Sequence, residues 1–162
     1  MVLQLFRKNK ELHFERSYPA PLETVWDAWT RAEALRAWWG PDKTRVTDCE
    51  VDPRVGGGIR IVMEATEEMG RYQGTRWPIE GVFTLVEPHH HLAYDARSWT
   101  EGEAETSTIE HHNDLTLVSD GDATVIELRI TISAIGSGAK MAAFGMKWGY
   151  KAQLDKLETY LR

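Results

Sequence analysis

Residues 124–161 read TVIELRITISAIGSGAKMAAFGMKWGYKAQLDKLETYL and carry most of the information about the architecture. The first part alternates apolar and polar residues, which is typical of a strand with one buried face: Ile126, Leu128, Ile130 and Ile132 share a side. Gly136-Ser137-Gly138 then breaks the strand, and Ser137 or a neighbour suits the cap of a helix. From Ala139 to Leu161 the apolar residues are spaced as on a helix. The stretch therefore predicts a strand that leads directly into a long helix.

Working back towards the N-terminus, alternating segments predict six more strands. They span residues 11–18, 46–51, 59–65, 79–86, 92–99 and 108–118. Pro21 opens a short helix after the first strand, and Thr30-Arg31-Ala32-Glu33 has the pattern of a capping box for a second. Successive antiparallel strands followed by a helix form two packed layers. The sequence predicts one α+β domain over residues 1–162, with the long helix packed on the inner face of a single antiparallel sheet.

Composition limits the classes of function. A chain of 162 residues is long enough to bury a core without disulfides or metals, and its single cysteine, Cys49, reads as a small core residue. The net charge of −6 and the scattered basic residues argue against nucleic-acid binding. No apolar run approaches the ~18 residues of a membrane span. Charge follows a short apolar stretch in residues 1–10, the reverse of a secretory signal, so the sequence predicts a cytoplasmic protein without membrane contact.

The last predicted hairpin directs attention to His111 and Asn113. With Asp120-Gly121 as a two-residue turn, His111 would lie opposite Ile130 and Asn113 opposite Leu128. Both polar side chains would then point towards the helix, among apolar residues. Two readings stay open at this point, because buried polar groups need partners: hydrogen bonds inside the protein, or contact with a ligand.

Other groups of chemical interest carry weaker signals. His89-His90-His91 falls in a turn, where consecutive side chains diverge, and Glu110, His112 and Asp114 share the outer face of a strand, which is usually solvated. The motifs of serine hydrolases, phosphate loops and zinc peptidases are missing. We therefore expect neither a metal nor a cofactor.

Five motifs together resemble a known family. They are Tyr18–Trp29 (YPAPLETVWDAW), Arg36–Pro41 (RAWWGP), Arg54–Gly58 (RVGGG), Gly81–Pro88 (GVFTLVEP) with Leu92–Tyr94 (LAY), and Gly149–Leu161 (GYKAQLDKLETYL). Their order over nearly the whole chain resembles the START-like, or SRPBCC, helix-grip superfamily. Within it they resemble the subfamily named for the activator of the heat-shock chaperone ATPase. The resemblance implies a curved seven-stranded sheet around the C-terminal helix, with an internal cavity.

Three functions from different classes follow from this reading. The first is the binding of a small apolar or aromatic molecule in that cavity. The second is a cyclase, hydrolase or isomerase that uses His111 as general acid or base. The third is a contact with a chaperone ATPase, and a homodimer also stays open. The predicted ligand contacts are Trp38, Trp39, Ile61, Met63, Trp77, Phe83, Tyr94, His111, Asn113, Leu115, Phe144 and Trp148, with Phe144 and Trp148 as the roof of the pocket.

Overall fold

The computed structural model describes residues 10–162. In chain order the elements are β1 (Lys10–Tyr18), α2 (Leu22–Thr30), α3 (Ala32–Trp38), β2 (Thr44–Val51), β3 (Gly58–Ala65), η1 (Glu67–Tyr72), β4 (Arg76–Glu87), β5 (His91–Ser98), α4 (Ala104–Ser107), β6 (Ile109–Asp120), β7 (Ala123–Ile135) and α5 (Lys140–Tyr160). The interpretation of residues 1–9 lies outside the described residues. Within residues 10–162, no helix has the length and hydrophobicity that crossing a bilayer requires.

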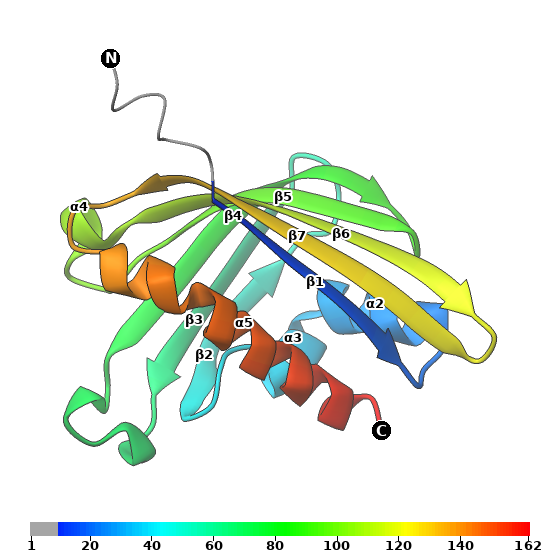
Figure 1. The fold of residues 1–162 in the computed structure, drawn as a ribbon, viewed down its shortest axis with the longest axis horizontal. Helices are drawn as coiled ribbons and strands as arrows, with labels where there is room; N and C mark the ends of the chain where they lie inside the picture. The colour runs from blue at the N-terminus through cyan, green and yellow to red at the C-terminus, as the bar shows by residue number, and fades with distance from the viewer. Residues whose placement is uncertain (1–9) are drawn as a thin grey trace.

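The seven strands form one antiparallel sheet in the order β1-β7-β6-β5-β4-β3-β2. Figure 1 shows α5 running across the hollow side of the curved sheet, with α2 and α3 near the C-terminal half of the helix. Alternate residues of the central strands are buried against this layer, as the apolar alternation in the sequence requires. The predicted α+β helix-grip architecture is confirmed.

The register of the β6–β7 hairpin differs from the prediction by two residues. Asp120 pairs with Ala123, so the turn is Gly121-Asp122, and Asn113 lies opposite Ile130 rather than Leu128. Gly121 has a φ of 61°, and the turn places this glycine first, where a positive φ is needed. Because the side-chain period of a strand is two, a shift of two keeps every residue on its predicted face.

Both predicted helix caps are wrong. Thr30 is the last residue of α2, and its hydroxyl donates to the carbonyl of Trp26 at 2.8 Å, so it does not cap the next helix. Ser137 lies before the N-cap of α5, which is Ala139, and no side chain of the described residues caps that helix. Gly138 instead donates its N–H to the carbonyl of Thr106 at 2.7 Å. The backbone of residues 136–138 is therefore held against the segment before β6, which places Ser137 away from the helix end.

Aromatic packing anchors the two short helices to the core. The rings of Trp29 and Trp38 lie 4.8 Å apart, those of Trp38 and Trp39 lie 5.5 Å apart, and the indole of Trp38 donates to the carbonyl of Ala28 at 2.8 Å. Tyr18 at the end of β1 donates its hydroxyl to the carbonyl of Leu154 at 3.0 Å. This bond ties the edge of the sheet to the second half of α5, and the first half lies over a cavity.

Candidate functional site

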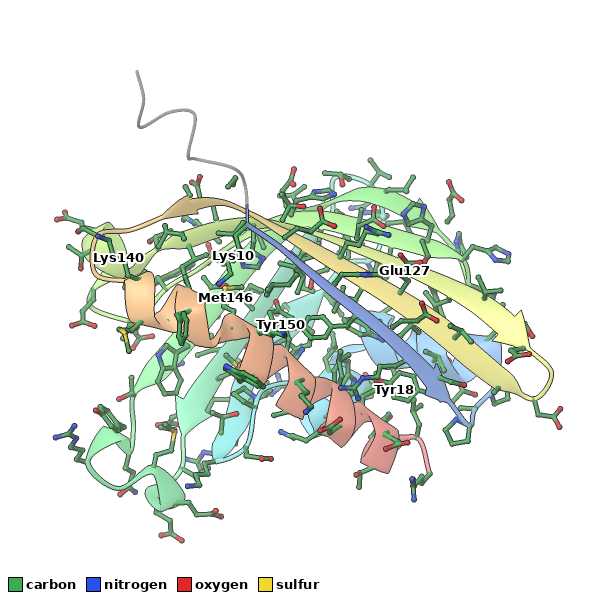
Figure 2. The ribbon with its side chains drawn as sticks, viewed as in Figure 1. Lys10, Tyr18, Glu127, Lys140, Met146 and Tyr150 are labelled. Atoms are coloured by element: carbon green, nitrogen blue, oxygen red, sulfur yellow. The ribbon has the colours of Figure 1, made fainter. Side chains whose placement is uncertain are left out.

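A cavity of ≈ 330 Å³ lies between the first half of α5 and the neighbouring parts of β3, β4 and β5. Figure 2 shows Met146 and Tyr150 projecting from α5 towards the sheet, and both line this cavity. Its walls are mainly apolar and aromatic, and they include Trp39, Pro41, Met63, Trp77, Pro78, Ile79, Ser98, Trp99, Ile109, Ala142, Met146, Tyr150 and Gln153. Its size falls near the lower end of the range for small-molecule sites, about 300–1,000 Å³.

Small residues of α5 border the cavity. Ala142, Gly145 and Gly149 line it at helical spacing. A Cβ built on Gly145 or Gly149 would meet no atom of the described chain within 4 Å. Glycine in a helix interior costs about 1 kcal/mol relative to alanine, so two glycines on one face lower the stability of the helix and leave room beside it.

The predicted ligand contacts divide into three groups. Trp39, Met63 and Trp77 line the cavity. A second group is buried in the core without lining it: Trp38, Ile61, Phe83, Tyr94, His111, Asn113 and Leu115. Their roles in binding stay predictions.

The third group requires a correction. Phe144 and Trp148 are 70% and 61% exposed, so they do not roof the cavity. They lie four residues apart on a different face of α5 from Ala142, Gly145, Met146 and Gly149. The spacing of the sequence shows two apolar stripes on this helix, and it was wrong to assign the larger side chains to the inner one.

Gln153 is a cavity residue that the sequence-based prediction missed, whereas Ser98 begins the segment 98–107, whose length beyond the family pattern pointed to ligand or partner contacts. Ser98 ends β5 and lines the cavity together with Trp99, Thr100, Glu103 and Ser107 of that segment. Gln153 follows Gly149 by four residues, so its position on the same helix face is a signal that spacing could have provided.

A buried polar chain runs from Ser98 through His111 to Asn113. His111 Nε2 lies 2.9 Å from the Oγ of Ser98, and its Nδ1 accepts from the Nδ2 of Asn113 at 2.8 Å. Because Nδ1 accepts, the neutral ring carries its proton on Nε2 and donates it to Ser98. Burial lowers the pKa of His111 to about 4 from its ordinary 6.5. The imidazole is therefore neutral near pH 7, and neither nitrogen has a free lone pair with which to accept a proton from Ser98.

Gln153 is another polar group of the cavity with a defined orientation. Its Oε1 accepts the backbone N–H of Gly40 at 3.1 Å, which fixes the amide. The other end, Nε2, is buried and has no hydrogen-bond partner among residues 10–162.

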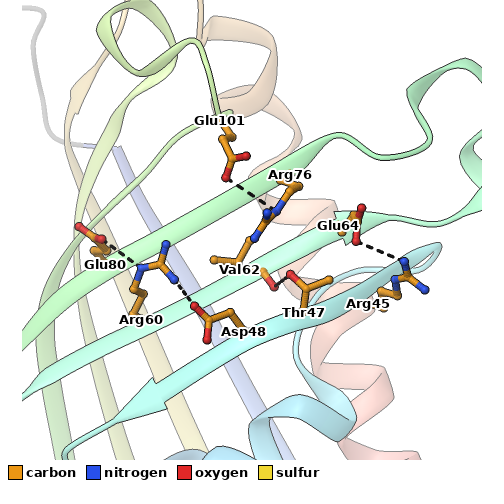
Figure 3. A network of polar contacts seen from close by, with 9 residues as sticks. All are labelled: Arg45, Thr47, Asp48, Arg60, Val62, Glu64, Arg76, Glu80 and Glu101. Carbon is orange, nitrogen blue, oxygen red and sulfur yellow. Dashed lines mark hydrogen bonds and ion pairs between the residues drawn. The ribbon is translucent and has the colours of Figure 1, made fainter.

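A larger hollow of ≈ 1020 Å³ lies over the outer face of the sheet, and polar and charged residues make up the greater part of its lining. Figure 3 shows part of this face, with Arg60 between Asp48 and Glu80. His112 contacts Asp95 at 2.6 Å, and Arg97 lies 3.6 Å from Glu80. These side chains contact one another across neighbouring strands, so the hollow offers fewer free groups than its size indicates.

The remaining histidines lie apart from the cavity. His91 contacts Asp114 at 2.9 Å, and His89 packs its ring edge against Trp26 with centroids 6.0 Å apart. Among residues 10–162, no three His, Cys, Asp or Glu side chains are grouped so as to hold a metal ion.

Comparison with known proteins identifies relatives by sequence and by structure. The sequence model of the family described as Activator of Hsp90 ATPase homolog 1-like protein matches residues 19–162. A solved structure from Rhodobacter sphaeroides is 25% identical, covers 93% of this chain and 91% of its own, and superposes with a TM-score of 0.72. One from Rhizobium loti is 20% identical, covers 95% of this chain and 98% of its own, and has a TM-score of 0.75. No curated protein matches this chain.

Proposed function

The chain belongs to the family described as Activator of Hsp90 ATPase homolog 1-like protein, and from this premise we propose that it binds a small, largely apolar molecule in the cavity between α5 and the sheet. The observation that carries the proposal is the pair of glycines with which α5 borders the cavity. Side chains at Gly145 and Gly149 would have room, and larger residues there would fill the cavity and improve the helix. Glycines that lower the stability of α5 and leave the cavity open are consistent with selection for a bound ligand.

The walls of the cavity fit such an occupant. Trp39, Trp77 and Tyr150 offer large apolar surfaces, and Met63 and Met146 are side chains that adapt to irregular shapes. Polar residues are the minority of the lining, namely Ser98, Thr100, Glu103, Ser107 and Gln153, which is the usual composition of a small-molecule site.

A cavity-filling substitution tests the proposal. We expect Gly149→Leu to weaken the binding of the neutral fluorescent probe N-phenyl-1-naphthylamine by about tenfold or more, which corresponds to about 1.4 kcal/mol. The matched control is Lys151→Leu, which adds a leucine at an exposed position of the same helix that does not line the cavity, and its affinity should stay near that of the wild type. Equal affinity in the two variants, or no binding by the wild type, would refute a cavity binder of this kind.

A contact with a chaperone ATPase is the second candidate, and one surface feature favours it. Met141, Phe144 and Trp148 form an exposed apolar stripe on α5, and contiguous apolar surface of this kind marks interaction sites. The description of the family names an activator of Hsp90 ATPase. If the stripe has this role, the wild type should raise the ATP hydrolysis rate of an Hsp90-type chaperone and the double variant Phe144→Ser/Trp148→Ser should not. The absence of any stimulation by the wild type would exclude this function.

A further inference from the structure

The first half of α5 carries large apolar side chains on its solvent-facing side. Met141, Phe144 and Trp148 are 82%, 70% and 61% exposed. They follow one another at intervals of three and four residues, so they form one stripe along the helix. A contiguous exposed stripe of this kind marks a contact surface, and the charges beside it indicate what it contacts.

Two lysines lie against the aromatic rings of the stripe. The Nζ of Lys10, in β1, lies 5.9 Å from the centre of the Phe144 ring and 3.4 Å from the carbonyl oxygen of Ala143. The Nζ of Lys147 lies 5.7 Å from the centre of the Trp148 ring. Figure 2 shows Lys10 beside the first half of α5, although it comes from the opposite end of the chain. Cationic groups are therefore held next to both exposed rings.

Further lysines follow the same edge of the stripe. Lys140 precedes Phe144 by four residues and Lys151 follows it by seven, and both are exposed. With Lys147 they form a cationic row along one side of the helix. The helix has no acidic residue before Asp155, whose carboxylate is paired with a guanidinium from β1. This face is thus cationic in a chain whose net charge is −6.

The combination of exposed aromatic rings and lysines favours a lipid surface over a protein partner. Lysine is depleted in protein–protein interfaces. A helix that lies in a membrane interface combines tryptophan and phenylalanine on its apolar side with lysines that bind anionic lipids. A row of lysines attracts a negatively charged leaflet, and each lysine near the surface adds to the attraction.

We propose that this stripe docks on the surface of an anionic phospholipid bilayer, where Phe144 and Trp148 enter the headgroup region and the lysines contact lipid phosphates. The sequence-based prediction of no membrane contact rested on the lack of an apolar run long enough to span a bilayer, and docking on its surface needs none. The inference is independent of the proposed function, because it concerns the outer side of α5 and not the cavity.

Binding to lipid vesicles tests the two halves of the proposal separately. Co-sedimentation compares vesicles of phosphatidylcholine alone with vesicles that contain about one-third phosphatidylglycerol, which supplies the negative charge. The variant Phe144→Ser/Trp148→Ser removes the rings and keeps the charge. The variant Lys140→Gln/Lys147→Gln removes charge and keeps the rings, and glutamine forms helices about as well as lysine. All four positions are exposed, and circular dichroism verifies that each variant folds.

We expect the wild type to bind the anionic vesicles, and each double variant to lower its partition coefficient by about tenfold or more. Phosphatidylcholine vesicles should bind the wild type more weakly by a similar factor. Matched controls are Val118→Ser, an exposed apolar residue of β6, and Lys43→Gln, an exposed lysine before β2, and both should bind like the wild type.

Failure of the wild type to bind anionic vesicles would overturn the inference, as would an unchanged partition coefficient in either double variant. If the wild type binds no vesicles but stimulates an Hsp90-type chaperone, and Phe144→Ser/Trp148→Ser does not, the stripe contacts a protein and the lipid proposal is wrong. None of these outcomes bears on the binding of N-phenyl-1-naphthylamine in the cavity, so the two proposals fail independently.

Discussion

His111 is buried, with 3% of its surface exposed, and both of its ring nitrogens are hydrogen-bonded. Of the two sequence-based readings of this residue, the geometry supports hydrogen bonding inside the protein. A leucine at this position would leave Ser98 and Asn113 without their partner. We expect His111→Leu to lower the free energy of unfolding by about 1–3 kcal/mol at pH 7.5, as measured by urea denaturation. A neutral or stabilising effect would show that the polar chain contributes nothing to the free protein.

The same histidine makes stability depend on pH. Burial lowers the folded-state pKa of His111 to about 4, so between about pH 6.5 and pH 4 the unfolded chain binds a proton that the folded chain does not. The contribution of His111 to the free energy of unfolding is fully present above pH 6.5. It is lost as the pH falls towards 4, and the total loss is about 3 kcal/mol. The advantage of the wild type over His111→Leu should therefore shrink between pH 7.5 and pH 5. His112→Leu, on the outer face, is the control and should not remove this pH dependence.

Cys49 is expected to be chemically inert in the folded protein. It is buried, and burial raises the pKa of its thiol to about 11, an effect that nearby Arg36 only partly offsets. Because the thiolate is the reactive species, labelling by 5,5′-dithiobis(2-nitrobenzoate) at pH 8 should be about a hundredfold slower than in urea. Rapid labelling of the native protein would mean that β2 opens readily.

At the scale of the element, α5 combines poor helix-forming residues with an unfilled inner face. Gly145→Ala and Gly149→Ala should each raise the free energy of unfolding by about 1 kcal/mol, because the new methyl groups meet no atom of the described chain. Gly136→Ala is the contrasting control, since its Cβ would lie 2.4 Å from the carbonyl oxygen of Thr106 and should destabilise the protein. Thermal melts of the three variants compare them directly. Destabilisation by Gly149→Ala would indicate that this glycine is needed for backbone reasons.

Elements were more predictable than the contacts at their ends. Apolar periodicity reflects which face of an element is buried, so it located the strands and helices. His111 lies on its predicted face of the sheet, although the register differs from the prediction by two residues. Caps depend on local competition for hydrogen bonds: the hydroxyl of Thr30 bonds back within α2, which no spacing rule shows. The side of α5 that Phe144 and Trp148 occupy depends on what the sheet presents, and that is tertiary information.

For the whole molecule, the order of elements was sufficient to predict the architecture, because a run of antiparallel strands followed by a helix has few ways to bury both apolar faces. The sequence predicted an internal cavity but only part of its lining. Its wall includes Trp39, Ser98 and Gln153, which come from distant parts of the chain and meet only after the sheet has curved. Their convergence could not be deduced from periodicity, which reports on one element at a time.

The two halves of α5 differ in how the rest of the molecule holds them, and this difference predicts its dynamics. In the described helix, the second half buries Gln153, Leu154 and Leu157 and accepts the bond from Tyr18, whereas the first half buries only Ala143 and lies over the cavity. Local opening is easiest where few apolar contacts must be broken. Amide hydrogen exchange followed by mass spectrometry should therefore be faster in residues 140–149 than in residues 150–160. The cavity is bordered by residues of α5 between Ala142 and Gln153, so saturation with N-phenyl-1-naphthylamine should slow exchange in residues 140–153 and leave residues 154–160 nearly unchanged. Uniform exchange along α5 in the free protein would contradict the looser hold on the first half, and protection confined to residues 154–160 would contradict binding in the cavity.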